Sequence, residues 1–277
     1  LDSRGSLAYG DLGRALQYIL DLQNSANAEG KPIIVVVNMS FGTINKSFPE
    51  GTEFSESIGE LFRQIKENGG ILFAAAGNLT SSLDPEQQIW PAASDLVIGV
   101  NGGFIAWDGE NQTVYPSMVK QGYRYSLGGG EVTWNGFSIP STTSDNSYGS
   151  LTGTSQASPG VAGIVTQLLM VFPELPPEDI LAALWSSGRS VEGTSTDSRF
   201  LNPLEALENL MREQGYAALL ELNTPTPMPP PSSTPSPTPT ATKTPDVIIT
   251  LPAIYYGWLP FVSGEETNEQ VPIVQPI

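Results

Sequence analysis

Apolar residues follow two alternating patterns along the first hundred positions. They recur at helical spacing over 12–22 and 54–67, and they form continuous apolar runs over 32–39, 71–76 and 96–100. The first pattern predicts amphipathic helices, and the second predicts strands buried on both faces of a parallel sheet. Alternating strands and helices favour right-handed crossover connections. The sequence therefore predicts an α/β fold of three layers around a doubly wound, mostly parallel sheet.

Glycine, proline and asparagine mark the limits of several predicted elements. The pair Gly69-Gly70 ends the helix over 54–67, and further helices are predicted over 176–187 and from Asn202 onward. The glycines at 128–130 lack the flanking lysine and helix start of a phosphate-binding loop. In doubly wound sheets a ligand site lies beyond the carboxyl ends of the strands. We therefore expect the site in the loops that begin at Asn38, Gly77 and Gly102.

A dense group of small residues over 153–163 is the strongest local signal. It precedes a helical apolar pattern over 161–172, so a serine is expected at the head of a buried helix. Backbone N–H groups and the positive end of the helix dipole would face that serine, which could then attack an acyl carbon. The alternative from spacing alone is an ordinary helix cap, since serine and threonine favour that position for the same donors.

Composition narrows the chemistry further. The 277 residues carry 12 Lys+Arg against 29 Asp+Glu, a net charge of −17, and include no histidine and no cysteine. The charge argues against nucleic acid as a partner, because phosphate binding needs clustered basic side chains. Disulfides, thiolate metal sites and any Ser-His or Cys-His pair within this chain are excluded. Acidic loops at 108–111 and 145–146 could bind structural calcium, although such loops are more often solvated turns.

The C-terminal quarter has a different composition. Residues 223–246 include nine Pro, seven Thr and three Ser, which predicts a linker without a core between a globular part over 1–222 and a short segment over 247–277. The apolar stretch 247–262 is too short and too interrupted by proline to cross a membrane. It is expected to act as a docking or sorting segment at the cell surface, or alternatively to form a short strand that packs on the globular part of its own chain.

Three ordered motifs carry a resemblance to a known family. They are Gly-Thr-Ser-Gln-Ala-Ser-Pro at 153–159, Asn-Met-Ser-Phe-Gly at 38–42 and Ala-Ala-Ala-Gly-Asn at 74–78, with Trp-Pro-Ala-Ala following at 90–93. Over roughly 1–211 the chain resembles the subtilisin-like serine proteases, from which it would comprise the C-terminal half to two-thirds of a catalytic domain. The resemblance implies a subtilisin-like fold that is truncated at its N-terminus.

The resemblance also implies site residues and partners. Ser155 would be the nucleophile and Asn78 the side-chain donor of the oxyanion hole, acting on a protein or peptide substrate. The expected substrate-binding residues are Ser40, Phe41, Gly42, Ala74, Ala75, Ala76, Gly77 and Thr154. Small side chains along 74–77 predict a preference for bulky apolar or aromatic residues before the cleaved bond. Members of the family are mostly secreted, so an extracellular or cell-surface protein is expected, monomeric when full length.

Departures from the family pattern limit what this chain can do. The catalytic aspartate and histidine of the family are expected before Leu1, so the chain alone is predicted to be inactive. Gly160 stands where the family has a histidine and Gln156 where it often has methionine, which raises a question of local packing. Three alternatives remain: a sedolisin-like Ser-Glu-Asp peptidase, a pseudoprotease, and a surface-displayed peptide-binding module without activity.

Overall fold

A computed structural model describes most of the region expected to be globular. The described residues are 9–44, 53–79, 89–107, 112–115, 125–126, 130–143, 147–191, 198–216 and 275–276. The expected linker, the apolar stretch 247–262 and both acidic loops lie outside these ranges. Among the described helices, none combines the length and apolar character that a membrane crossing requires.

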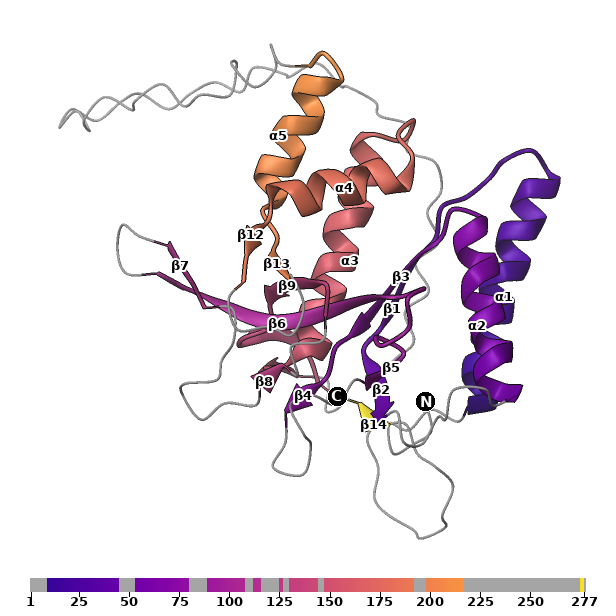
Figure 1. Cartoon of the computed structure of the whole chain (residues 1–277), viewed down its shortest axis with the longest axis horizontal. Helices are drawn as coiled ribbons and strands as arrows, with labels where there is room; N and C mark the ends of the chain where they lie inside the picture. The colour runs from indigo at the N-terminus through magenta and orange to yellow at the C-terminus, as the bar shows by residue number, and fades with distance from the viewer. Residues whose placement is uncertain are drawn as a thin grey trace, which may run out of the picture.

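A seven-stranded sheet forms the middle layer of the described fold (Figure 1). The first five strands in spatial order run parallel to one another. Two further strands pair antiparallel: β12 with the fifth strand, β13, and β7 with the third strand, β6. The predicted mostly parallel sheet is thus confirmed. In spatial order the path is β1 (Val36–Met39), β3 (Ile71–Ala75), β6 (Ile98–Trp107), β9 (Val132–Asn135), β13 (Arg199–Phe200) and β12 (Arg189–Ser190), with β7 (Gln112–Tyr115) paired to β6.

Helices cover both faces of this sheet, which gives the three predicted layers. Strand β3 is buried along its whole length, and its alternate residues face opposite layers because side chains alternate along a strand. Leu72 and Ala74 pack towards α1 (Tyr9–Ala28) and α2 (Glu53–Glu67). Ile71 and Phe73 pack towards α3 (Thr154–Val171), α4 (Pro177–Ser187) and α5 (Pro203–Glu213).

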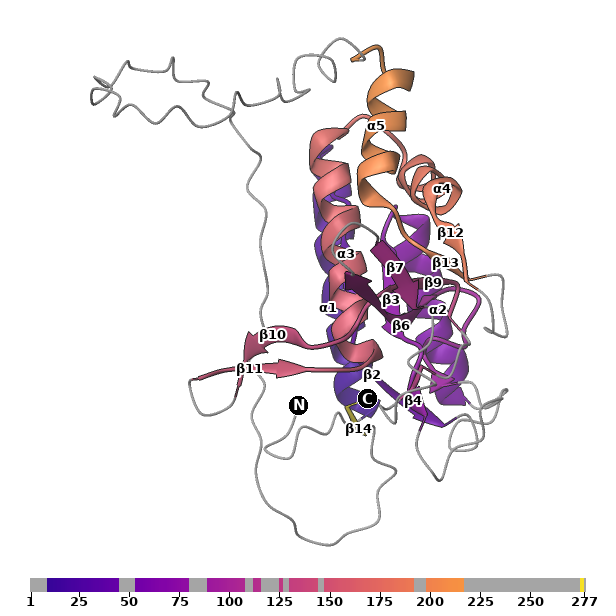
Figure 2. The ribbon, with the colours of Figure 1, turned by 90° about the vertical axis from the view of Figure 1, so that its left-hand side faces the viewer.

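Short strands complete the fold around the carboxyl ends of β1 and β3. They are β2 (Phe41–Ile44), β5 (Ile89–Trp90) and β14 (Gln275–Pro276) in one small sheet, the pair β4 (Asn78–Leu79) and β8 (Tyr125–Ser126), and the hairpin β10 (Ile139–Thr142) with β11 (Tyr148–Leu151). The hairpin projects from the body of the molecule (Figure 2). The bond between Trp90 and Pro91, in the Trp-Pro-Ala-Ala segment at 90–93, is a cis peptide.

Two strand predictions are wrong in their limits. The run 32–39 yields only the strand β1, since pairing with β3 begins at Val36, and Ile33 and Ile34 before it are 40% and 41% exposed. Strand β1 is also not buried on both faces, because Asn38 is exposed. The run 96–100 starts in a turn, and its strand β6 continues to Trp107 because β9 and β7 pair with it. Gly102 is therefore inside a strand and begins no loop.

The helix predictions are confirmed, with α1 longer at both ends than expected. Gly69 follows α2 with a φ of 82°, a conformation that favours glycine after a helix. Asn202 caps α5, since its side-chain oxygen accepts a hydrogen bond from the N–H of Glu205. These signals act over a few residues, which is why the sequence alone reveals them.

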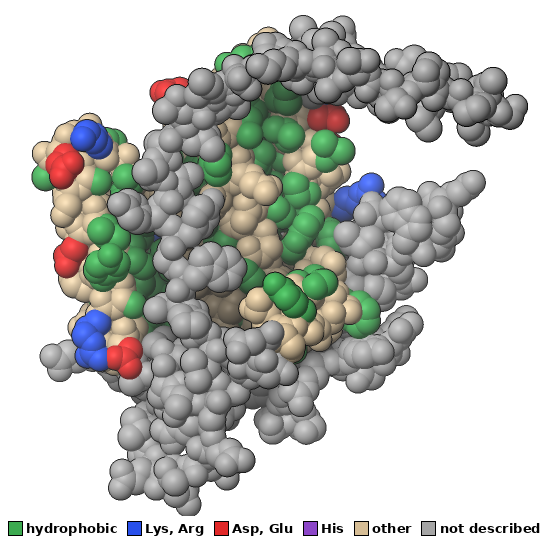
Figure 3. All heavy atoms as spheres, turned by 180° about the vertical axis from the view of Figure 1, so that it is seen from behind, with side chains coloured by type: hydrophobic (Ala, Val, Ile, Leu, Met, Phe, Trp, Pro, Cys, Tyr) green, Lys and Arg blue, Asp and Glu red, His purple; other side chains and the backbone are tan. Residues whose placement is uncertain are grey.

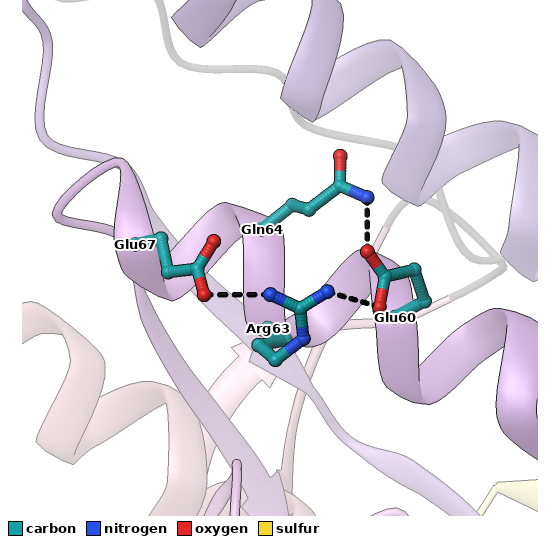
Figure 4. Close-up of polar contacts among 4 residues, drawn as sticks. All are labelled: Glu60, Arg63, Gln64 and Glu67. Atoms are coloured by element: carbon teal, nitrogen blue, oxygen red, sulfur yellow. Dashed lines mark hydrogen bonds and ion pairs between the residues drawn. The ribbon is translucent and has the colours of Figure 1, made fainter.

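The outer face of α2 carries a group of exposed ion pairs (Figure 4). Arg63 donates to both Glu60 and Glu67, and Gln64 donates to Glu60. The hydrogen bond from Arg63 lowers the pKa of Glu60, and the two carboxylates raise the pKa of Arg63. Such exposed pairs contribute little to stability. Seen from behind, most of the visible charged side chains lie on the side of α1 and α2, with a few at the top and on the opposite side, whereas hydrophobic and uncharged side chains dominate the centre (Figure 3).

A buried polar cluster joins β6 to the far side of the sheet. The Asn101 side chain, with no exposed surface, donates to the Gly130 carbonyl at 2.8 Å and to Ser198 Oγ at 3.1 Å, and accepts from the Gly130 N–H at 3.0 Å. Ser198 in turn bonds the hydroxyl of Thr133 at 2.9 Å. A Cβ on Gly130 would lie 2.8 Å from the Gly99 carbonyl oxygen. Glycine at this end of the 128–130 run is thus required by close backbone approach.

Candidate active site

Ser155 is the second residue of α3, as the small-residue pattern predicted. Gly153 precedes the helix as its N-cap and makes no side-chain contact, so the helix start is not an ordinary side-chain cap. The Ser155 hydroxyl is half-buried and donates to the Ser40 carbonyl at 3.4 Å. The Ser40 hydroxyl donates back to the Ser155 carbonyl at 2.8 Å. The loop after β1 and the head of α3 are thus joined on both sides of Ser155.

Asn78 lies beside the same helix end with its amide orientation fixed. Its Oδ1 accepts from the Thr154 N–H at 2.9 Å and from the Thr154 hydroxyl at 3.2 Å. A backbone N–H can only donate, so the atom facing it must be the oxygen of the amide. The Gly77 N–H donates to the Thr154 hydroxyl at 3.2 Å, which settles the direction of that hydroxyl as well. Nδ2 of Asn78 is consequently the branch turned away from Thr154.

Glycines allow three backbone segments to meet at this point. A Cβ on Gly153 would lie 2.9 Å from Asn78 Nδ2, so the amide occupies the space that a side chain would need. A Cβ on Gly136 would lie 2.5 Å from the Gly153 carbonyl oxygen, and the Gly153 N–H donates to the Gly136 carbonyl at 2.9 Å. The Gly136 N–H donates in turn to Gly103 at 2.8 Å. The head of α3 is therefore held against the middle of β6 and the end of β9.

A second set of hydrogen bonds ties β1 to α3. Ser158 Oγ, one turn after Ser155 and fully buried, donates to Asn38 Oδ1 at 2.6 Å, and Asn38 Nδ2 donates to Ser40 Oγ at 3.0 Å. Asn38 and Ser158 were not expected to have roles beyond their motifs. Asn38 was singled out only as the start of a loop at a strand end, and that position was the available signal.

The other expected site residues are placed by β2 and β3. Ser40 and Phe41 are half-buried and Gly42 is buried, at the start of β2. Ala74 and Ala75 have no exposed surface and belong to the interior of β3. Ala76 and Gly77 follow as the chain turns towards Asn78. That these four small residues form the wall of a specificity pocket stays a prediction.

The chemistry of the described site is that of neutral donors. The side chains bonded around Ser155 and Asn78 belong to serine, threonine and asparagine, none of which accepts a proton at neutral pH. Two donors converge on the same helix end: the Asn78 amide and the N–H groups that a helix leaves unpaired in its first turn. Such an arrangement can stabilise a negatively charged oxygen. Within the described ranges, no group of three acidic side chains could hold a metal.

The packing question raised by Gly160 is answered by β9. A Cβ at this position would lie 2.6 Å from Cδ1 of the Trp134 indole. Trp134 is half-buried and stacks at a tilt on Phe200, with 5.7 Å between ring centroids. The absence of a side chain at 160 is therefore matched by a tryptophan on the neighbouring strand.

A parallel sheet flanked by helices, with a serine at the head of the central helix, defines a three-layer α/β protein of the subtilisin-like fold. Residues 11–216 match the subtilase family, and the chain belongs to this family of serine proteases. The expectations drawn from the three motifs about family and fold are thus confirmed.

Known relatives agree with this assignment. The chain is 30% identical to subtilisin DY of Bacillus licheniformis over 156 residues, which cover 56% of this chain and 50% of the relative. The chain thus spans about half the length of the curated relative it matches.

Solved structures share the fold. The S41 psychrophilic protease superposes with a TM-score of 0.51 at 23% identity, over 71% of this chain and 60% of its own. A subtilase cytotoxin, solved for the assembly of SubAB, gives 0.54 at 21% identity, over 77% and 68%.

Proposed function

We propose that the protein is a serine endopeptidase of the subtilisin type in which Ser155 attacks the peptide carbonyl. The observation that carries this proposal is the fixed amide of Asn78: its oxygen is held by the Thr154 N–H at 2.9 Å, so its N–H₂ group is left as a donor at the head of α3. The Ser155 backbone N–H, in the first turn of the helix, is the second proposed donor. Together they would hold the oxyanion that forms when Ser155 Oγ bonds to the carbonyl carbon.

The two donors differ in how they are supported. The backbone N–H is positioned by the helix itself, whereas Asn78 depends on the contacts of Thr154 and on the absence of side chains at Gly77 and Gly153. Loss of one oxyanion donor raises the barrier by about 2.7–4 kcal/mol, a magnitude measured on subtilisin, a relative in the same family. Because both donors are in place before substrate binds, they need no reorganisation during the reaction.

The proton of Ser155 requires a base that this chain does not contain. No histidine occurs in the sequence, and the hydroxyl donates to the backbone carbonyl of Ser40, a group that does not act as a base at neutral pH. We place the catalytic aspartate and histidine in a part of the whole protein that precedes this chain. The chain by itself is then inactive, since nucleophile and oxyanion hole without a base give little catalysis.

Strand β2 is the proposed binding strand for an extended protein or peptide substrate. It starts next to Ser40, whose carbonyl and hydroxyl both contact Ser155. Main-chain pairing of this kind supplies affinity without reading the sequence of the peptide. Preference for a bulky apolar residue before the cleaved bond, and an extracellular or cell-surface location, follow from the family and from the acidic, Pro/Thr-rich composition.

A peptide-binding module without catalysis is the second candidate. Its support is that β2 forms a small sheet with short strands from two other parts of the chain, a pairing of the kind that an extended peptide would make. The sedolisin-like alternative has less support, because the family matched is the subtilases and Asn78, not an aspartate, occupies the oxyanion position.

Activity of the complete protein tests the proposal. Peptide-amide hydrolysis should disappear in Ser155→Ala, and kcat should fall 10²- to 10³-fold in Asn78→Ala with little change in KM. Asn68→Ala is the matched control, since the Asn68 side chain donates to the exposed Asn24 side chain, outside the proposed catalytic machinery. Hydrolysis that persists in Ser155→Ala would contradict the proposal, and a complete protein that binds peptides without cleaving them would favour the binding module.

A further inference from the structure

Strand β2 already carries an extended segment of the chain itself. β14 pairs antiparallel with β2, with Gln275 opposite Gly42 and Pro276 opposite Phe41. On the remaining half of β2, Thr43 and Ile44 pair with β5. Figures 1 and 2 both show β14 beside the start of β2, far in sequence from the rest of the domain. The residues used by β14 are Phe41 and Gly42, two of the three expected to bind an extended substrate.

The direction of β14 leads towards the candidate nucleophile. Because the pairing is antiparallel, the chain passes from the level of Gly42 to that of Phe41 and so heads towards Ser40. Ser40 is the residue whose carbonyl accepts from the Ser155 hydroxyl at 3.4 Å. Phe41, the partner of Pro276, directly follows Ser40, so β14 ends one strand step, about 3.4 Å, from the level of the Ser40–Ser155 contact.

We propose that the segment around 275–276 is a built-in competitor for the peptide-binding strand, so that the protein inhibits itself. The inhibitory part of this inference rests on the proposed function, whereas the occupancy of β2 does not. The segment would be displaced by substrates that pair with β2 more tightly, and released whenever the segment is removed or bound elsewhere.

Weak pairing in the same chain is sufficient for such competition. β14 is joined to the described domain through residues 217–274, so its pairing with β2 takes place within one chain. Tethering within one chain gives an effective concentration on the order of 1 mM. A segment that binds with a Kd of about 0.1 mM when free would then weaken the binding of an added peptide about tenfold.

Proline substitution provides a sharp test of the pairing. Pro276 has no N–H to donate, so Gln275 and Gly42 are the pair able to exchange two backbone hydrogen bonds. Gln275→Pro removes the remaining donor from β14 without touching β2. Gln270→Pro makes the same change five residues earlier, outside the pair, and is the matched control. Neither position belongs to the proposed catalytic machinery.

Two measurements on the chain as it stands need no catalysis. Hydrogen exchange followed by NMR should show the Gly42 amide protected in the parent chain and in Gln270→Pro, and exchanging at least tenfold faster in Gln275→Pro. Fluorescence anisotropy with a labelled peptide of residues 271–277 should give an apparent Kd about tenfold lower for Gln275→Pro than for the other two proteins. Equal protection and equal peptide affinity in all three would overturn the inference.

Further outcomes separate the two proposals. Protection of Gly42 that disappears on dilution would mean that β14 pairs between copies, which would overturn the self-occupancy. In an active complete protein, Gln275→Pro should lower KM and leave kcat unchanged, as expected for loss of a competitor; an unchanged KM would contradict the inhibitory role. If exchange and anisotropy behave as expected but the complete protein cleaves nothing, the proposed function fails and the occupancy of β2 stands.

Discussion

An asparagine side chain has different surroundings near each of the two flanks of the sheet. The closed flank is formed by β9, β13 and β12. On β6 beside it, Asn101 has no exposed surface, and its amide makes three hydrogen bonds to backbone and hydroxyl groups. On the open flank, formed by β1, Asn38 is exposed, and among the described residues its amide bonds the hydroxyls of Ser40 and Ser158. Both are asparagines in strands of the same sheet, so the difference comes from their surroundings.

The comparison distinguishes a polar side chain that stabilises the fold from one that lies at the candidate active site. A buried amide must be fully paired, because an unpaired polar group inside a protein costs free energy, and Asn101 therefore fixes the geometry of its flank. The open flank has different properties: β1 has one neighbouring strand in the described ranges, and Ile33 and Ile34 before it are well exposed. The candidate active site lies on the open flank, where hydrogen bonds can exchange partners.

Truncating the two asparagines should give the largest difference between the flanks. Asn101→Ala removes three buried hydrogen bonds, two of them to the backbone of Gly130, and we expect a loss of about 3 kcal/mol in the free energy of unfolding. Asn38→Ala should cost less than about 1 kcal/mol, since water can replace it and the Ser158 hydroxyl can turn to a carbonyl of its own helix. Urea unfolding of both variants provides the measurement, and equal losses would show that the flanks do not differ.

Two glycines of α3 test whether the packing against the closed flank is tight. Gly160→Ala brings a methyl group to 2.6 Å from the Trp134 ring, and overpacking of this kind costs about 1–3 kcal/mol. Gly163→Ala meets no atom within 4 Å and should stabilise the protein by up to about 1 kcal/mol, because alanine favours the helix. Thermal melting of the two variants should therefore shift in opposite directions. A stabilising Gly160→Ala would contradict the tight contact with Trp134.

The smallest expected effect concerns a carboxyl at the start of the closed flank. Glu131 borders an apolar cavity of about 230 Å³ together with Val132 and Trp185, and removal from water raises the pKa of its carboxyl. The folded state thus holds the proton more tightly than the unfolded state, so this contribution to stability is complete below the unfolded pKa of about 4.5 and is lost as the pH rises through the folded value.

The stability of Glu131→Gln relative to the parent protein should therefore be higher at pH 7 than at pH 4. The difference should be less than about 1 kcal/mol, because the Glu131 side chain is partly in water. Urea midpoints at the two pH values measure the difference. Glu174→Gln, an exposed carboxyl in the turn after α3, is the control and should show a smaller change. A larger relative stability of Glu131→Gln at pH 4 than at pH 7 would contradict a raised pKa of Glu131 in the folded state.

Local patterns account for what could be predicted. The helices were visible because their apolar spacing and caps act within a few residues, as at Gly69 and Asn202. The position of Ser155 at a helix head followed from small residues next to a helical pattern. Short strands such as β5 and β10 were missed, because a strand of two to four residues has too few positions to show an alternation.

The sequence by itself determined the family, the layered α/β fold and the absence of a histidine base, since motifs and composition do not depend on contacts. Only the tertiary structure decided the orientation of the Asn78 amide, the match of Gly160 with Trp134, the burial of Asn101 and the pairing of β14 with β2. Each of these joins residues distant in sequence: Asn78 and Thr154 are 76 positions apart, and Asn101 and Ser198 are 97 apart. The sequence gives the chemistry of a side chain, whereas the fold determines which distant residue it contacts.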